Sequence, residues 1–107
     1  MPASFTRRNT KNIGSVATKV GNFTASNPTA MLTLTLSNTS NSEITTSVYH
    51  NQSHNASANT YWGKYIPIPV GGVVVMSKKI LVANDSVYVV SSASNSLDAS
   101  MDLMIDS

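Results

Sequence analysis

The sequence contains no cysteine, little charge and no long apolar run. Without cysteine, neither a disulfide nor a thiolate metal site can form. Charged residues make up 11% of the chain, whereas about 25% is usual in a soluble domain. No stretch approaches the roughly 18 apolar residues of a membrane-spanning helix, and no apolar run of signal-peptide length follows the basic residues near the start. These absences predict a fold that packing alone stabilises, no membrane partner, and synthesis in a cytoplasm.

The residues that are present favour one core and a neutral surface. The 107 residues are the usual size of one domain, and 41% of them are hydrophobic. Ser, Thr and Asn take the place of charged residues in much of the chain. Such a surface has little like-charge repulsion against self-association. We therefore expect the protein to form a homo-oligomer.

Short β-branched runs with period-two alternation predict strands, and no segment has helical periodicity. The clearest run is AMLTLTL at 30–36, and the valine-rich stretch 66–90 is divided by turn signals into further short runs. The predicted strands lie at 13–20, 30–36, 44–49, 60–66, 72–76, 79–83, 86–90 and 97–105. This pattern predicts an all-β, single-domain antiparallel β-sandwich of about eight strands, either jelly-roll or immunoglobulin-like. We expect residues 1–12 to form an extended basic N-terminal arm and residues 13–107 to form the sandwich.

The run Val73, Val74, Val75 and Met76 is apolar at every position. In a strand, successive side chains point to opposite faces, so both faces of this strand would be apolar. The domain's own core can cover only one of them. We therefore predict that these four residues form an apolar interface with a neighbouring protein.

The charges are polarised along the chain, and two interpretations stay open. The acidic residues on one face of the last strand can be a solvated face that discourages wrong strand pairing. Alternatively, the basic arm of one subunit contacts the acidic strand of the next. Three cations without a known motif do not predict a nucleic-acid partner. The residues concerned are Arg7, Arg8 and Lys11 in the arm, and Asp98, Asp102 and Asp106 in the last strand.

The polar stretch 50–59 is expected to be an exposed loop, and its two histidines do not predict a metal site. His50 and His54 have no carboxylate or cysteine nearby to complete four ligands. No serine lies in a nucleophile motif. The three aspartates lie too far apart along one strand for paired acid catalysis. We predict no catalytic residue, no metal and no cofactor.

The aromatic residues Tyr61, Trp62 and Tyr65 follow this loop. Two interpretations stay open for them as well. Aromatic residues in strands most often pack in the core, but a cluster beside a loop can also be a stacking platform for a sugar. The second interpretation predicts a carbohydrate- or receptor-binding module.

Several segments resemble small all-β accessory virion proteins of tailed bacteriophages, especially phages of marine and cyanobacterial hosts. They span nearly the whole chain in order: TRRNTKNIGSVA, LTLTLSNTSNSEITTSVY, IPIPVGG, ILVANDSVYV and LDASMDLMI. The resemblance implies a non-enzymatic structural component of the virion, such as a head-decoration protein or a neck or tail adaptor. It implies capsid, neck or tail proteins as partners and the virion as the location. The stretch at 50–59 and the Tyr-Trp pair depart from the family pattern.

Overall fold

The computed structural model describes residues 3–52 and 59–106, which contain eight β-strands and no helix. The prediction of an all-β fold with about eight strands is confirmed. The strands are β1 (Ala3–Ile13), β2 (Thr18–Thr24), β3 (Thr29–Asn38), β4 (Ile44–Gln52), β5 (Asn59–Ile68), β6 (Val73–Leu81), β7 (Asp85–Ser91) and β8 (Leu97–Asp106).

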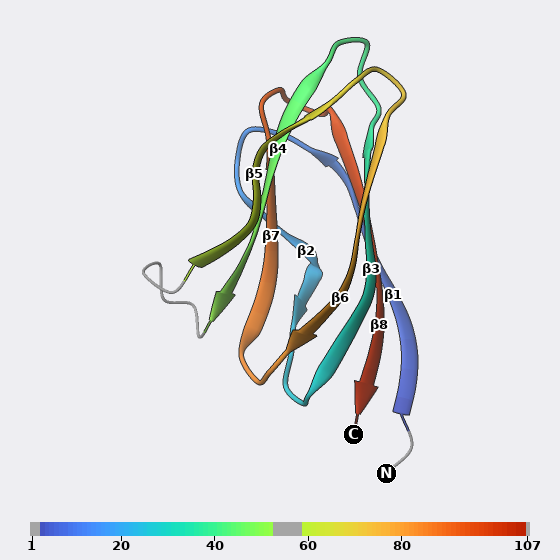
Figure 1. Ribbon diagram of the computed structural model, residues 1–107, viewed down its shortest axis with the longest axis vertical. Helices are drawn as coiled ribbons and strands as arrows, with labels where there is room; N and C mark the ends of the chain where they lie inside the picture. Colours follow the sequence, from blue (N-terminus) through green and yellow to red (C-terminus); the bar gives the residue numbers. More distant parts are fainter. Residues whose placement is uncertain (1–2, 53–58, 107) are drawn as a thin grey trace.

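The strands form two facing four-stranded sheets, which Figure 1 shows nearly edge-on. Sheet A has the order β1-β8-β3-β6 and sheet B has the order β2-β7-β4-β5, and all pairings are antiparallel. An immunoglobulin sandwich would place its first two strands side by side in one sheet. Here consecutive strands alternate between the sheets except for β4 and β5, which pair in sheet B, and the first strand pairs with the last. This order is that of a jelly roll, which settles the choice between the two sandwich types.

The core lies between the sheets and follows the expected alternation. In β8, Leu97, Ala99, Met101 and Leu103 are all buried, while the residues between them are half-buried on the other face. Similar inward residues in the other strands complete one apolar cluster. Its largest fully buried members from the remaining strands are Ile13, Val20, Met31, Leu34, Leu36, Ile44, Val48, Ile68 and Leu81.

Residues 3–13 are extended, as expected of the N-terminal arm, but they belong to sheet A. They form β1, which pairs with β8 from Ala3 opposite Asp106 to Ile13 opposite Leu97. The strand predicted at 13–20 is therefore wrong: Ile13 ends β1, and β2 begins at Thr18. Backbone pairing with β8 fixes this edge strand, and an edge strand with little buried apolar surface has no period-two signature.

One further boundary differs from the predictions. The strands predicted at 72–76 and 79–83 are one strand, β6, whose register with β3 is continuous. Lys78 has a positive φ of 61° inside it, so the turn signal marks a local irregularity. The faces of β3 also differ: the run AMLTLTL predicts Leu32 on the same face as Leu34 and Leu36, but Met31 is buried with them and Leu32 is exposed. A register shift against β8 between Met31 and Thr33 causes the reversal.

The loop predicted at 50–59 is wrong at both ends, where the described residues belong to strands. His50, Asn51 and Gln52 continue β4 and pair with residues 85–87 of β7, and Asn59 begins β5. Pairing with a central strand keeps this polar segment extended although it lacks apolar alternation. His54 lies outside the described residues.

Candidate functional site

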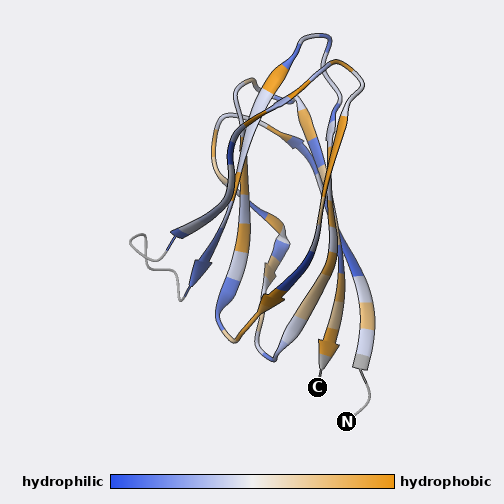
Figure 2. Ribbon diagram, in the orientation of Figure 1, coloured by the Kyte–Doolittle hydropathy of each residue, from blue (hydrophilic) through white to orange (hydrophobic). Residues whose placement is uncertain are grey.

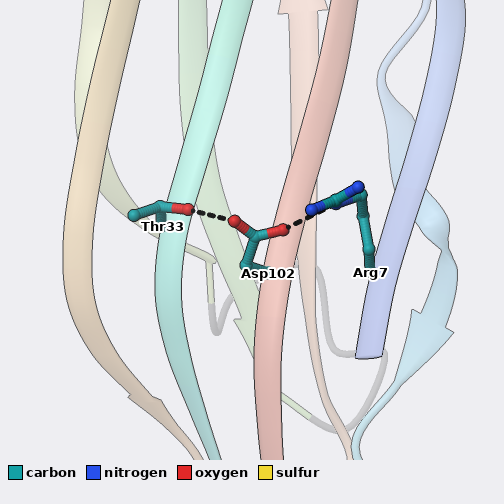
Figure 3. A network of polar contacts seen from close by, with 3 residues as sticks. All are labelled: Arg7, Thr33 and Asp102. Atoms are coloured by element: carbon teal, nitrogen blue, oxygen red, sulfur yellow. Dashed lines mark hydrogen bonds and ion pairs between the residues drawn. The ribbon is translucent and has the colours of Figure 1, made fainter. Parts of the chain in front are cut away.

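The outer face of sheet A carries a row of polar side chains across three strands. Arg7 of β1 is opposite Asp102 of β8, and Asp102 is opposite Thr33 of β3. Arg7 Nε donates to Asp102 Oδ1 at 3.1 Å, and Thr33 Oγ1 donates to Oδ2 at 2.8 Å. Figure 3 shows the carboxylate held between the two donors. The hydrogen bonds from Thr33 and then from Arg7 lower the pKa of the Asp102 carboxyl.

Basic and acidic residues predicted to meet between subunits thus meet within one chain. Besides the Arg7 pair, the backbone N–H of Asn12 donates to Asp98 Oδ1 at 3.0 Å. Arg8 points elsewhere: its guanidinium lies 5.4 Å from the centre of the Phe23 ring and donates to the Gly21 carbonyl. The side chain of Asp106 lies outside the described residues.

Beside the polar row lies an open hollow of about 490 Å³ on the same face. Lys11 lines it together with Asp98, Thr35 and Ser37, and none of its lining residues is aromatic. A second hollow of about 390 Å³ adjoins Arg7 and Asp102 on the other side and includes Phe5 and Leu32. The face therefore changes from polar to apolar along the strands.

The apolar end of this face is a row that crosses all four strands. Phe5 pairs with Met104, Met104 with Ala30, and Ala30 with Ile80. Phe5 is 74% exposed and Ile80 is 71% exposed. Leu32 is exposed as well. We call these residues the end patch: Phe5, Ala30, Leu32, Ile80 and Met104.

The four residues predicted as an apolar interface lie in β6 and divide between its two faces. Val74 and Met76 face inward and pack against the core cluster. Val73 and Val75 face outward and are more than half exposed. In Figure 2, β6 begins orange, turns blue at its lysines and ends orange. The outward valines are therefore a second apolar segment on the β6 edge, separated from Ile80 by Ser77, Lys78 and Lys79.

The outer face of sheet B carries a row of tyrosines that the sequence analysis did not find. Lys19, Tyr88, Tyr49 and Tyr61 are successive cross-strand partners on β2, β7, β4 and β5. The Tyr49 and Tyr61 rings are stacked with centres 5.1 Å apart, and the Tyr88 ring is 5.4 Å from Tyr49. Burial, followed by the neighbouring Tyr61 and Tyr88, raises the pKa of the Tyr49 hydroxyl. Only the strand register, which the sequence does not state, places these residues together.

The proposed sugar platform is divided by the fold. Tyr61 and Tyr65 are exposed, whereas Trp62 packs against the core cluster. The centres of the Trp62 and His50 rings are 5.8 Å apart. Lys64 Nζ lies 4.9 Å from the Tyr61 ring centre and 5.5 Å from that of Tyr65. Ring faces engaged in these contacts are not open for stacking on a sugar or a base.

Neither a metal-binding cluster nor a membrane-spanning helix is present in the described residues. They contain no group of three or more His, Cys, Asp or Glu side chains that could hold a metal ion. Nor does the described part of the chain contain a helix long and apolar enough to span a membrane.

Comparison with known proteins finds similarity in structure and not in sequence. No protein-family model and no curated protein sequence matches the chain. A chain of infectious bursal disease virus, Gx strain, superposes with a TM-score of 0.55 at 11% identity, covering 97% of this chain. A chain from the acid-stable capsid structure of Helicobacter pylori bacteriophage KHP30 gives 0.51 at 12% identity, covering 97% of this chain and 87% of that chain. PirA gives 0.50 at 10% identity, covering 88% of this chain and 90% of that one.

This chain spans a third of the length of the bursal disease virus chain, 33%. At such low identities the comparisons show a shared fold. Two of these structures with this fold are of viruses, one of them a bacteriophage capsid.

Proposed function

We propose that this protein is a non-enzymatic structural component of a tailed-phage virion, a head-decoration protein or a neck or tail adaptor that assembles as a homo-oligomer. The observation that carries the proposal is the apolar surface on the outer face of sheet A. Phe5 and Ile80 are each more than 70% exposed at the two edges of the end patch. Val73 and Val75 add a second exposed apolar segment on β6, on the other side of Ser77, Lys78 and Lys79. Apolar area gathered on one face of a small domain is typical of a surface that another protein covers.

Four further features support the proposal. The jelly-roll order of the strands also supports a virion role, because viral capsid domains use this architecture. A phage capsid chain of nearly the same length superposes on the fold. The low charge of the chain leaves little repulsion between neighbouring copies. The sequence resemblance to phage accessory proteins points in the same direction.

The test uses a phage that encodes this chain, from which the gene is deleted and then supplied in trans. Wild-type protein should co-sediment with the purified particles. The double substitution Phe5→Ser with Ile80→Ser should reduce the bound fraction at least tenfold, since it removes the two most exposed residues of the end patch. Each site is largely exposed, so the free energy of unfolding should change by less than about 0.5 kcal/mol per site.

The matched control is Val16→Ser with Tyr65→Ser. Both residues are about as exposed as Phe5 and Ile80, and both lie outside the outer face of sheet A. This control should bind particles like the wild type. Wild-type protein that stays in the supernatant would overturn the proposed function. Equal loss with both double variants would overturn the assignment to sheet A.

A further inference from the structure

The edge strand β6 differs from the other sheet edges in its lack of protection against pairing. The β5 edge contains Pro67 within its pairing with β4 and a positive φ at Tyr65. Proline and irregular backbone both hinder the addition of another strand. The β2 edge has a register shift against β7 and positive φ values at Gly21 and Asn22. These features leave neither strand a flat, uninterrupted edge.

The β1 edge is protected by charge and by contacts with β2. Arg7, Arg8 and Lys11 lie along it. Thr10 Oγ1 accepts a hydrogen bond from the Gly21 N–H at 2.6 Å, and Arg8 donates to the Gly21 carbonyl. These hydrogen bonds join the edge of β1 to β2 of the other sheet. A new strand would have to displace these contacts.

The first half of β6 has no such device. Residues 73–77 carry no charge and no proline, and their register against β3 runs without a shift from Ser37 opposite Val73 to Thr33 opposite Ser77. The segment is bounded on one side by the turn at Gly71, which has a φ of 72°, and on the other by Lys78, with a φ of 61°. Within the described residues no strand pairs with the far side of β6. Alternate backbone N–H and C=O groups along that side are left for an outside partner.

We propose that this edge pairs with β6 of a second copy, antiparallel, across a two-fold axis at Val75. The inference rests on the proposed homo-oligomer and identifies its contact. Antiparallel pairing of a strand with itself is an isologous contact, so one self-complementary segment is sufficient. Val75 is the middle residue of the regular stretch 73–77. An axis there uses the whole stretch and joins two copies of sheet A into one continuous sheet.

The side chains fit this register. Directly opposite residues in antiparallel strands point to the same face. Outward-facing Val75 would meet its own copy, and inward-facing Val74 would meet Met76, so both faces match. Lys78 would lie opposite Gly72 and away from the lysines of the partner. A parallel arrangement would instead place the Ser77-Lys78-Lys79 segments of both chains side by side, with like charges adjacent.

The absence of cysteine makes a cross-linking test clean, because each variant carries a single thiol. Val75→Cys should form a disulfide dimer in mild oxidant, since the two residues face each other. Ile80→Cys is the control on the same strand and should stay monomeric, because symmetry-related positions there are about 34 Å apart at the usual strand rise. Ile80 is the more exposed of the two residues, 71% against 59%. Random collisions would therefore favour Ile80→Cys, and that order would overturn the pairing.

A second pair of variants tests the contact without cysteine. Sedimentation equilibrium should give twice the chain mass for wild type at high concentration. Val75→Lys should weaken self-association at least tenfold, because it places two ammonium groups across the axis, whereas Ile80→Lys should still dimerise. Thermal unfolding of both variants checks that they fold. Unchanged association of Val75→Lys, or a wild type that stays monomeric, would overturn this inference. The proposed virion role would fail separately, through wild-type protein that does not bind particles.

Discussion

Each outer face of the sandwich carries a row of cross-strand neighbours, tyrosines on sheet B and apolar residues on sheet A, and the two rows differ in their contacts. On sheet B the tyrosine row is satisfied within the chain, because Tyr49 stacks on Tyr61 and contacts Tyr88. On sheet A the apolar row ends at Phe5 and Ile80, which are largely exposed. The aromatic face therefore has ring contacts within its own chain, even though Tyr61 and Tyr65 are exposed. Residue type alone does not identify an interaction surface; what matters is whether neighbours in the same chain already cover the side chain.

The charged residues of the two faces follow the same division. On sheet B, Lys64 lies over two tyrosine rings, and Lys19 Nζ donates to Thr24 Oγ1 at 2.9 Å. On sheet A, Arg7 pairs with Asp102, and Asp98 accepts a hydrogen bond from the Asn12 backbone N–H, so both carboxylates have partners within the chain. The apolar part remains. This comparison is why we place the assembly surface at the end patch and β6.

The largest expected effect separates the inner and outer aromatic residues of β5. Trp62→Ala should lower the free energy of unfolding by about 2 to 3 kcal/mol, somewhat below the usual cost for a fully buried aromatic residue, because Trp62 is only partly buried. Tyr65→Ala, at an exposed position, should cost less than about 0.5 kcal/mol. Urea unfolding followed by circular dichroism measures both. Equal costs would mean that β5 does not divide its aromatic residues between two faces.

The tyrosine row should show a direct coupling energy. A double-mutant cycle with Tyr49→Ala and Tyr61→Ala should give about 0.5 to 1.5 kcal/mol, the range for stacked aromatic pairs. Lys64→Ala with Tyr88→Ala provides a control cycle whose members share no recorded ring contact. It should give a coupling near zero. If the Tyr49–Tyr61 coupling also vanished, the rings would be free to stack on an outside ligand.

Alkaline pH should weaken the sheet B face selectively. The pKa of Tyr49 is raised in the folded protein, so the unfolded chain loses this proton first as the pH rises. The contribution of the protonated Tyr49 hydroxyl to the free energy of unfolding is complete below the ordinary pKa of 10.0. It is lost as the pH rises from there through the folded-state pKa. Tyr49→Phe should therefore lose less stability than the wild type as the pH rises above 10.0. Parallel pH profiles for the two proteins would show that the tyrosine row does not restrain this ionisation.

Much of the sandwich could be predicted from the sequence because inward positions of its central strands are apolar. The alternating runs of β3 and β8 predict both strands. A register shift in β3 nevertheless leaves Met31 buried and Leu32 exposed. β1 could not be predicted in the same way. Its backbone pairing with β8 depends on two segments separated by the whole chain. β6 looked divided because the Lys78 region resembles a turn.

The sequence could give charged residues for the candidate site but not their geometry. Opposite charge at the two ends of the chain suggested a contact between subunits, whereas in the structure the first and last segments pair within one chain. Whether they meet within one chain or between two depends on the topology, which places β1 beside β8. The tyrosine row gave no signal, because Tyr49, Tyr61 and Tyr88 are distant in sequence and only the register of sheet B aligns them.

The smallest effect concerns the Arg7–Asp102 pair. Both side chains are considerably exposed, so a double-mutant cycle should give only about 0.2 to 1 kcal/mol, decreasing with added salt. The lowered pKa of Asp102 means that this contribution is present above the ordinary value of 3.8 and is lost as the pH falls through the folded-state pKa. Asp102→Asn should flatten the acid side of the stability profile. A profile that keeps its slope would assign the acid sensitivity to other carboxyl groups.

Charge exchange distinguishes a pair within one chain from a contact between subunits. Arg7→Glu and Asp102→Arg each place like charges opposite each other on β1 and β8. Combined in one chain, they should restore most of the lost stability, because the pair is rebuilt with its polarity reversed. Mixing the two single variants should restore nothing, since neither chain then holds a complementary pair. If the mixture recovered stability or particle binding, β1 of one copy would also contact β8 of another copy. That is the contact between subunits that the charge pattern of the sequence suggested.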